Sequence, residues 1–185
     1  MINDVIKDMQ RRMHGAIEAL HNEFRSLRTG RANASMLDGV MVEYYGTATP
    51  IAQVASITVP ESSMIVATPW DKTMVAAIEK AIRNADLGLN PANDGKIVRI
   101  PVPQLTEERR KDLVKKAHHI AEESRTAIRQ VRRDGNDKLK KMMKNHEISE
   151  DDEKRGLDEI QKLTDKHIDE VATILQHKEQ DILEV

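Results

Sequence analysis

TEERRKDLVKKAHHIAEESRTAIRQVRRDGNDKLKKMM, residues 106–143, is a proline-free run in which apolar or small side chains recur every three or four positions. This spacing predicts one amphipathic helix of about 40 residues, roughly 60 Å long. Its expected inner stripe is Leu113, Ala117, Ile120, Ser124, Ala127, Val131, Leu139 and Met142. Thr106 suits the N-cap position, and Glu107 then lies in the positive first turn. Gly135 interrupts the helix at a cost of about 1 kcal/mol relative to alanine.

Two more long helices are predicted on either side of this run. The first covers residues 2–27 and is expected to end near Gly30, where glycine tolerates a left-handed backbone. The last begins after Ser149, an N-cap residue, with Asp152 in the place of the capping-box glutamate. The expected apolar seam of this last helix is Leu157, Ile160, Thr164, Ile168, Val171, Leu175 and Ile182.

None of the three helices can bury its apolar stripe alone, so a three-helix bundle made of residues 1–29 and 106–185 is predicted. An intermolecular coiled coil is the alternative. The short link at residues 144–148 favours a hairpin within one chain.

Residues 30–105 have a different character and are predicted to form a small inserted α+β domain. All six prolines lie here, and short β-branched runs are bounded by Gly, Pro, Asn or Ser. One helix is expected over residues 74–85. The chain crosses between the domains twice, at residues 29–31 and 101–105. We predict that these crossings form a hinge, whose residues are Thr29, Gly30, Pro101, Val102, Pro103 and Gln104.

Composition excludes several classes of protein. The 185 residues include no cysteine, so disulfides and thiolate metal sites are excluded. We found no apolar run long enough to span a membrane and no signal-peptide core, so a cytoplasmic protein is expected. The adjacent His118 and His119 would point about 100° apart on a helix and could not clamp one metal. Because no catalytic, phosphate-loop or metal spacing was found, we expect neither an enzyme nor a cofactor.

Charge is segregated along the chain. Residues 106–145 carry 13 Lys or Arg and 7 Asp or Glu, whereas residues 146–185 carry 5 and 13. Within the basic segment, Arg125, Arg129, Arg132 and Arg133 share one side of the predicted helix. Four arginines without an intervening lysine favour binding of phosphates in a structured RNA. The alternative is a solvated, salt-bridged surface, neutralised by Asp134, Asp137 or the acidic last helix.

Several motifs, found in order along nearly the whole chain, resemble those of bacterial ribosome recycling factors. They are Arg28-Thr29-Gly30-Arg31-Ala32, Val42-Glu43-Tyr44-Tyr45-Gly46-Thr47, Asp86-Leu87-Gly88-Leu89-Asn90-Pro91, Leu105-Thr106-Glu107-Glu108-Arg109-Arg110-Lys111, Val131-Arg132-Arg133-Asp134 and Glu147-Ile148-Ser149-Glu150-Asp151-Asp152. One departure is Gly135, where the family more often has alanine.

The resemblance implies an L-shaped α+β molecule, with an elongated three-helix bundle and an inserted β/α/β sandwich. It implies a factor in translation termination that binds the 50S subunit across the aminoacyl and peptidyl sites. Elongation factor G would use GTP to drive subunit dissociation, so this chain would need no cofactor. In the family, arginines matching Arg129 and Arg132 contact 23S rRNA, and Arg133, Arg28 and Arg31 are further candidates. A monomer that binds neither DNA nor membranes is expected.

Two other classes of protein are alternatives to a ribosome recycling factor. A helical chaperone or coiled-coil scaffold would bind through apolar grooves, and arginine substitutions would hardly affect it. A hydrolytic or metal enzyme would require a metal site or a perturbed pair of carboxylates, and no spacing in the sequence supports one.

Overall fold

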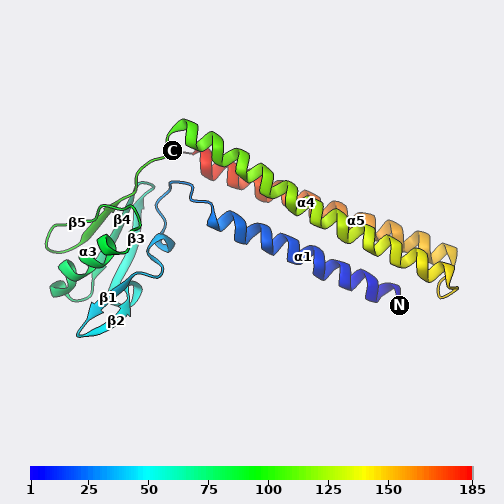
Figure 1. Cartoon of the computed structure of the whole chain (residues 1–185), viewed down its shortest axis with the longest axis horizontal. Helices are drawn as coiled ribbons and strands as arrows, with labels where there is room; N and C mark the ends of the chain where they lie inside the picture. The colour runs from blue at the N-terminus through cyan, green and yellow to red at the C-terminus, as the bar shows by residue number, and fades with distance from the viewer. Residues whose placement is uncertain (185) are drawn as a thin grey trace. The chain divides into compact units, whose positions relative to one another are not determined.

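The structure is a computed structural model, and it describes residues 1–184. The described chain divides into two compact units (Figure 1). One contains Met1–Arg28 and Glu107–Glu184, and the other contains Thr29–Thr106. Long helices make up the first unit, and two small sheets lie in the second. The predicted α+β class is therefore confirmed.

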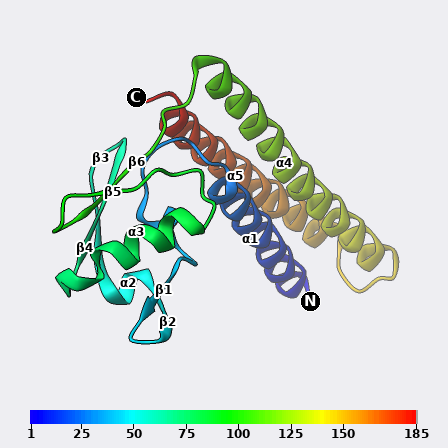
Figure 2. The ribbon, with the colours of Figure 1, turned by 60° about the vertical axis from the view of Figure 1, so that its left-hand side comes forward.

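Three long helices form the first unit: α1 (Ile2–Ser26), α4 (Glu107–Lys144) and α5 (Glu150–Leu183). Each helix contacts the other two, and α4 runs opposite to α1 and α5 (Figure 2). Their apolar stripes meet in one core, where Met13, Ile128 and Ile160 are fully buried. Because the core closes within one chain, the stripes need no second chain to bury them.

The end of α1 differs from the prediction. The helix ends at Ser26, and Leu27 already has an extended backbone, so placing the end near Gly30 was wrong by about one turn. Gly30 does have a positive φ of 76°, but it lies outside the helix. A Cβ at Gly30 would lie 2.6 Å from Leu105 Cγ, on the second crossing. Gly30 therefore permits a close approach between the two crossings.

The buried stripe of α4 also differs from the prediction. Ala127 is exposed and Ile120 is only half-buried, whereas Ala121 and Ile128 are buried. Gly135 lies in this stripe, and a Cβ there would lie 2.6 Å from Met9 Cε on α1. The glycine that the sequence marked as a helix interruption is thus a point of close helix packing.

The last helix was predicted well at its start and less well along its seam. Ser149 is the N-cap: its hydroxyl accepts a hydrogen bond from the Asp152 amide at 3.1 Å and donates one to Asp152 Oδ2 at 2.7 Å. These contacts with Ser149 lower the pKa of the Asp152 carboxyl. Gly156 and His167 are buried in the seam, in place of the expected Leu157 and Ile168.

The second unit contains two antiparallel sheets. One is a hairpin, and the other is a four-stranded sheet in the order β3-β4-β6-β5. The strands are β1 (Met41–Tyr44), β2 (Thr47–Pro50), β3 (Ala55–Glu61), β4 (Met64–Pro69), β5 (Ala92–Asn93) and β6 (Val98–Pro101). Helix α3 (Val75–Asn84) contacts β1 of the hairpin and both β5 and β6 of the larger sheet. The buried residues of this unit form one core around α3.

Short elements complete the second unit. They are the helix α2 (Ile51–Val54) and two 3₁₀ turns, η1 (Ala34–Leu37) and η2 (Lys72–Met74). The sequence predicted neither α2 nor the strands β2 and β5. No helix of the described residues is long and apolar enough to cross a membrane.

Candidate nucleic-acid interface

Four arginines of α4, Arg125, Arg129, Arg132 and Arg133, form what we call the arginine face. At 100° per residue they span an arc of about 100° on the helix. The Arg125 side chain is 20% exposed and that of Arg129 is 41% exposed, whereas Arg133 is an exposed residue. The arginine face therefore extends from the edge of the bundle core out to solvent.

A single carboxylate on the same helix holds two of these arginines. Glu122 Oε2 lies 3.2 Å from Arg125 Nη1, and Glu122 Oε1 lies 2.8 Å from Arg129 Nη1. Hydrogen bonds from Arg129 and Arg125 lower the pKa of the Glu122 carboxyl, so Glu122 is ionised at neutral pH. Sequence reasoning missed Glu122, although its spacing of three and seven residues from these arginines was a usable signal.

The other two arginines meet little negative charge. Arg132 Nη1 donates to Gln161 Oε1 of α5 at 3.5 Å, so its partner on the acidic helix is a neutral amide. Among the described residues, no carboxylate of α5 forms an ion pair with the arginine face. The possibility that the acidic helix neutralises these arginines therefore receives no support from the packing.

Asp134, an expected partner, does not pair with the arginine face. Its Oδ2 lies 2.6 Å from Arg12 Nη2 of α1, and its Oδ1 accepts from Gln130 Nε2 at 2.8 Å. The physical reason is angular: Asp134 lies on the side of α4 that faces α1, whereas Arg132 faces α5. The arginine face thus keeps a net positive charge.

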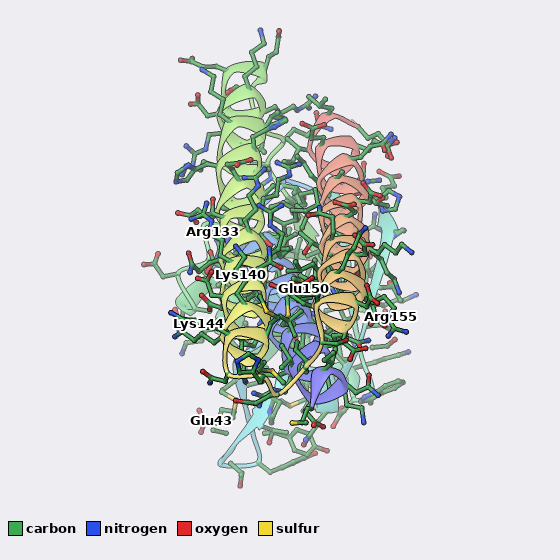
Figure 3. The ribbon with its side chains drawn as sticks, turned by 90° about the vertical axis from the view of Figure 1, so that its right-hand side faces the viewer. Glu43, Arg133, Lys140, Lys144, Glu150 and Arg155 are labelled. Carbon is green, nitrogen blue, oxygen red and sulfur yellow. The ribbon has the colours of Figure 1, made fainter. Side chains whose placement is uncertain are left out.

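The positive surface continues along α4 towards its C-terminal end. Lys140 and Lys144 follow Arg133 at seven and eleven residues, and Figure 3 shows all three on the outer side of the helix. Among the described residues there is no group of three or more His, Asp or Glu that could hold a metal ion. The chemistry available on this surface is recognition of anions by hydrogen bonding and charge.

Arg28 does not join the arginine face. Ser124 on α4 lies level with Ala16 on α1, since the Ser124 hydroxyl contacts the Ala16 carbonyl at 3.3 Å. Arg28 therefore lies about three helical turns beyond the level of Ser124, on the side away from Arg129 and Arg133. Arg31 belongs to the other compact unit. Within the described residues of the first unit, the predicted site residues that the structure brings together are the four arginines of α4.

Comparison with protein families identifies the class of protein as a translation factor. The family model described as ribosome recycling factor matches residues 20–183. The chain belongs to the ribosome recycling factor family, as the motifs in its sequence predicted.

Individual relatives agree along the whole chain. The ribosome-recycling factors of Legionella pneumophila (strain Paris) and Syntrophomonas wolfei are each 56% identical over 185 residues, covering 100% of both chains. A solution structure of the ribosome recycling factor has a TM-score of 0.74, with 43% identity over 100% of this chain and 98% of that chain.

A second solved structure carries a functional description. It is described as models for the T. thermophilus ribosome recycling factor and the E. coli elongation factor G bound to the E. coli post-termination complex. Its TM-score is 0.64, with 45% identity over 99% of each chain.

Proposed function

We propose that this chain binds the large ribosomal subunit of the post-termination complex and, with elongation factor G and GTP, promotes dissociation of the subunits. Family membership and the related factor on a post-termination complex support this function. Binding would span the aminoacyl and peptidyl sites. The subunits would then be free for another round of translation.

The RNA contacts are proposed to come from Arg129, Arg132 and Arg133, with 23S rRNA phosphates as their ligands. The observation that carries this proposal is the net positive charge left on the arginine face after Glu122 is counted. A guanidinium presents five N–H donors, so Arg129 can keep its contact with Glu122 and still bind a phosphate. Arg28 and Arg31 are proposed as additional contacts, separate from this surface.

No chemistry by this chain is required for the proposed role. Nucleotide hydrolysis would belong to elongation factor G, and the chain would act without a cofactor. It would transmit force between its two units through the hinge residues named above. We propose that it does so as a cytoplasmic monomer and that it binds neither DNA nor membranes.

Co-sedimentation with purified 50S subunits at low and high salt tests this function. The intact chain is compared with Arg129→Ala/Arg132→Ala and with the control Lys162→Ala/Lys166→Ala, which removes two exposed cations from α5. We expect salt-sensitive binding that the arginine variant loses and the lysine control retains. Each lost phosphate contact should reduce the slope of log K against log salt by about 1.

Two results would contradict the proposal in different ways. If both double variants lost 50S binding equally, only the total charge would matter. The assignment of Arg129 and Arg132 as RNA contacts would then be wrong. No binding by the intact chain would instead favour a helical chaperone or scaffold. In that case affinity for a partner would depend little on salt.

A further inference from the structure

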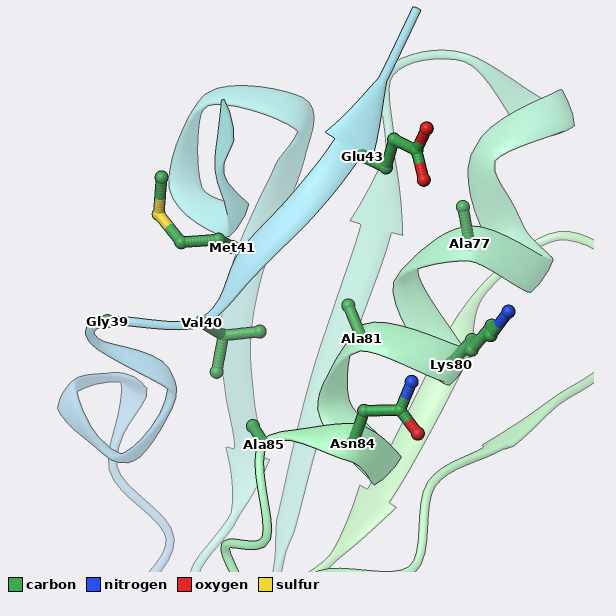
Figure 4. Close-up of a pocket in the computed structure, with 9 residues that line it drawn as sticks. All are labelled: Gly39, Val40, Met41, Glu43, Ala77, Lys80, Ala81, Asn84 and Ala85. Atoms are coloured by element: carbon green, nitrogen blue, oxygen red, sulfur yellow. The ribbon is translucent and has the colours of Figure 1, made fainter. Parts of the chain in front are cut away.

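A groove of about 460 Å³ lies in the second unit, between β1 and α3 (Figure 4). Val40, Met41 and Glu43 line it from β1 and the residue before it. Ala77, Lys80 and Ala81 line it from α3. The groove contains none of the arginines discussed above. Its walls are a strand edge and the exposed side of a helix.

The hydrogen-bond pattern of the hairpin shows which backbone groups face away from β2. The two-residue turn at Tyr45 and Gly46 has positive φ at both positions, 47° and 79°, as a type I′ turn requires. Such a turn is closed by a hydrogen-bonded pair, here Tyr44 with Thr47. Hydrogen-bonded and non-hydrogen-bonded pairs then alternate along the strands. Met41 and Glu43 consequently occupy non-hydrogen-bonded positions.

Two independent contacts agree with this assignment. Ile51 donates its amide to the Val40 carbonyl at 3.1 Å, which continues the hydrogen-bonded series at even-numbered residues of β1. Pro50, which has no N–H, stands opposite Met41. The N–H and C=O groups of Met41 and Glu43 therefore point to the outer edge of β1. Among the described strands, only β2 pairs with β1.

Charge distinguishes this groove from a merely apolar cleft. Glu43 and Lys80 are both exposed and lie on opposite walls, yet no ion pair within 4.0 Å joins them. Between them, Ala77 and Ala81 offer small side chains that let a backbone approach α3. Met41 is 49% exposed at the rim. The groove thus has a row of backbone donors and acceptors flanked by one negative and one positive side chain.

We propose that an extended segment of a protein partner binds in this groove by adding a strand to the free edge of β1. Its backbone would pair with Met41 and Glu43, as in other cases of strand addition. A basic side chain would face Glu43 and an acidic one would face Lys80. RNA is the less suitable occupant, because the groove offers a single cation and no aromatic ring for stacking.

The partner is expected within the ribosomal complex, so this inference rests on the proposed function. Hydrogen exchange of the full chain, free and bound to purified post-termination ribosomes, provides the first test. In the free chain the amides of Met41 and Glu43 should exchange rapidly. In the complex we expect exchange of the segment 40–44 to slow by about tenfold or more, because main-chain hydrogen bonds form there. Binding without such protection would overturn the inference and leave the proposed function intact.

Variants at Met41 separate the backbone contact from the side chain. Met41→Pro removes one outward N–H without affecting the pairs that face β2, whereas Met41→Ala changes only the side chain. We expect the proline variant to bind post-termination ribosomes about three- to tenfold more weakly than the alanine variant, because it loses one main-chain hydrogen bond to the partner. Equal affinities would count against strand addition, provided that thermal unfolding shows both variants folded.

A photoreactive residue at Ala81 identifies the occupant even if the proline variant fails to fold. Cross-linking of the bound full chain to a protein segment supports the proposal. Cross-linking to RNA, or to a second copy of this chain, contradicts it. If the intact chain does not sediment with the ribosomes at all, the proposed function and this inference both fail.

Discussion

Gly135 is buried in α4 where α1 approaches, and Met9 occupies the space that a side chain at this position would need. From the sequence alone, this glycine was predicted only to weaken the helix. The difference arises because its neighbour lies on another helix, far away in the chain. Intrinsic propensity is local, whereas packing against Met9 depends on how the bundle closes.

This contact predicts that the effect of Gly135→Ala changes sign with the residue at position 9. In the natural chain, the gain in helix propensity is opposed by overpacking against the buried Met9, and we expect a net destabilisation of about 1 kcal/mol. In a Met9→Ala background the added methyl finds space, and the same change should stabilise by about 1 kcal/mol. Urea unfolding of the four proteins of this double-mutant cycle measures the coupling. The same effect in both backgrounds would show that the contact is unimportant.

At the scale of elements, predictability followed the strength of the local pattern. The long helices have many turns of periodic sequence, and their existence and approximate ends could be predicted. The strand β2, Thr47–Pro50, contains no alternating apolar residues, and β5 has only two residues. Both are strands because a neighbouring strand pairs with them. Ile120 and Ala127 were misplaced because each lies beside a second apolar residue, Ala121 or Ile128, and the packing of the partner helices decides which of the two is buried.

The N-cap of α5 gives a prediction with a defined pH dependence. Ser149→Ala should destabilise the bundle by about 1 kcal/mol at neutral pH, because the Asp152 amide loses its acceptor. The Ser149 hydroxyl also lowers the pKa of the Asp152 carboxyl from its ordinary value of 3.8. The stability that comes from this lowered pKa is fully present above pH 3.8. It is lost as the pH falls through the lower pKa that Asp152 has in the folded protein.

The difference in the free energy of unfolding between Ser149→Ala and the natural chain should therefore shrink below a pH of 3.8. Urea unfolding, followed by the helical circular dichroism signal at several pH values, tests this. Ser149→Thr, which keeps a hydroxyl, serves as the control and should behave like the natural chain. A difference that stays constant down to the acid range would show that Asp152 does not contribute through its charge.

At the scale of the whole molecule, the segregated charge and the arginine spacing could be predicted from the sequence. The pairing of Arg125 and Arg129 with Glu122 lies within one helix, so its spacing was a usable signal. The partners of Asp134 and Arg132 could not be predicted, because they depend on which helix packs on which side of α4. Asp134 faces Arg12 on α1, and Arg132 meets Gln161 on α5. Local spacing placed the four cations on one side of a helix. Tertiary packing determined only that Asp134 pairs with Arg12 and that Arg132 meets a neutral amide.

The two chain crossings predict that the bundle and the sheet unit reorient in solution. Gly30 has a positive φ and lies against Leu105, so a side chain at residue 30 would be strained both in its backbone and by contact. The chain lacks cysteine, so Thr47→Cys and Lys162→Cys, both at exposed positions, can carry a fluorescent donor and acceptor. Single-molecule energy transfer should give more than one distance, and Gly30→Ala should change their populations.

A label pair within the bundle, at Lys116 and Lys162, is the matched control. It should give one distance that Gly30→Ala does not change, because α4 and α5 pack along their length. If the pair that joins the two units also gives one narrow distance, unaltered by Gly30→Ala, the crossings do not act as a hinge. Force from a partner would then have to move the chain as a rigid body, and Gly30 would serve only the close packing against Leu105.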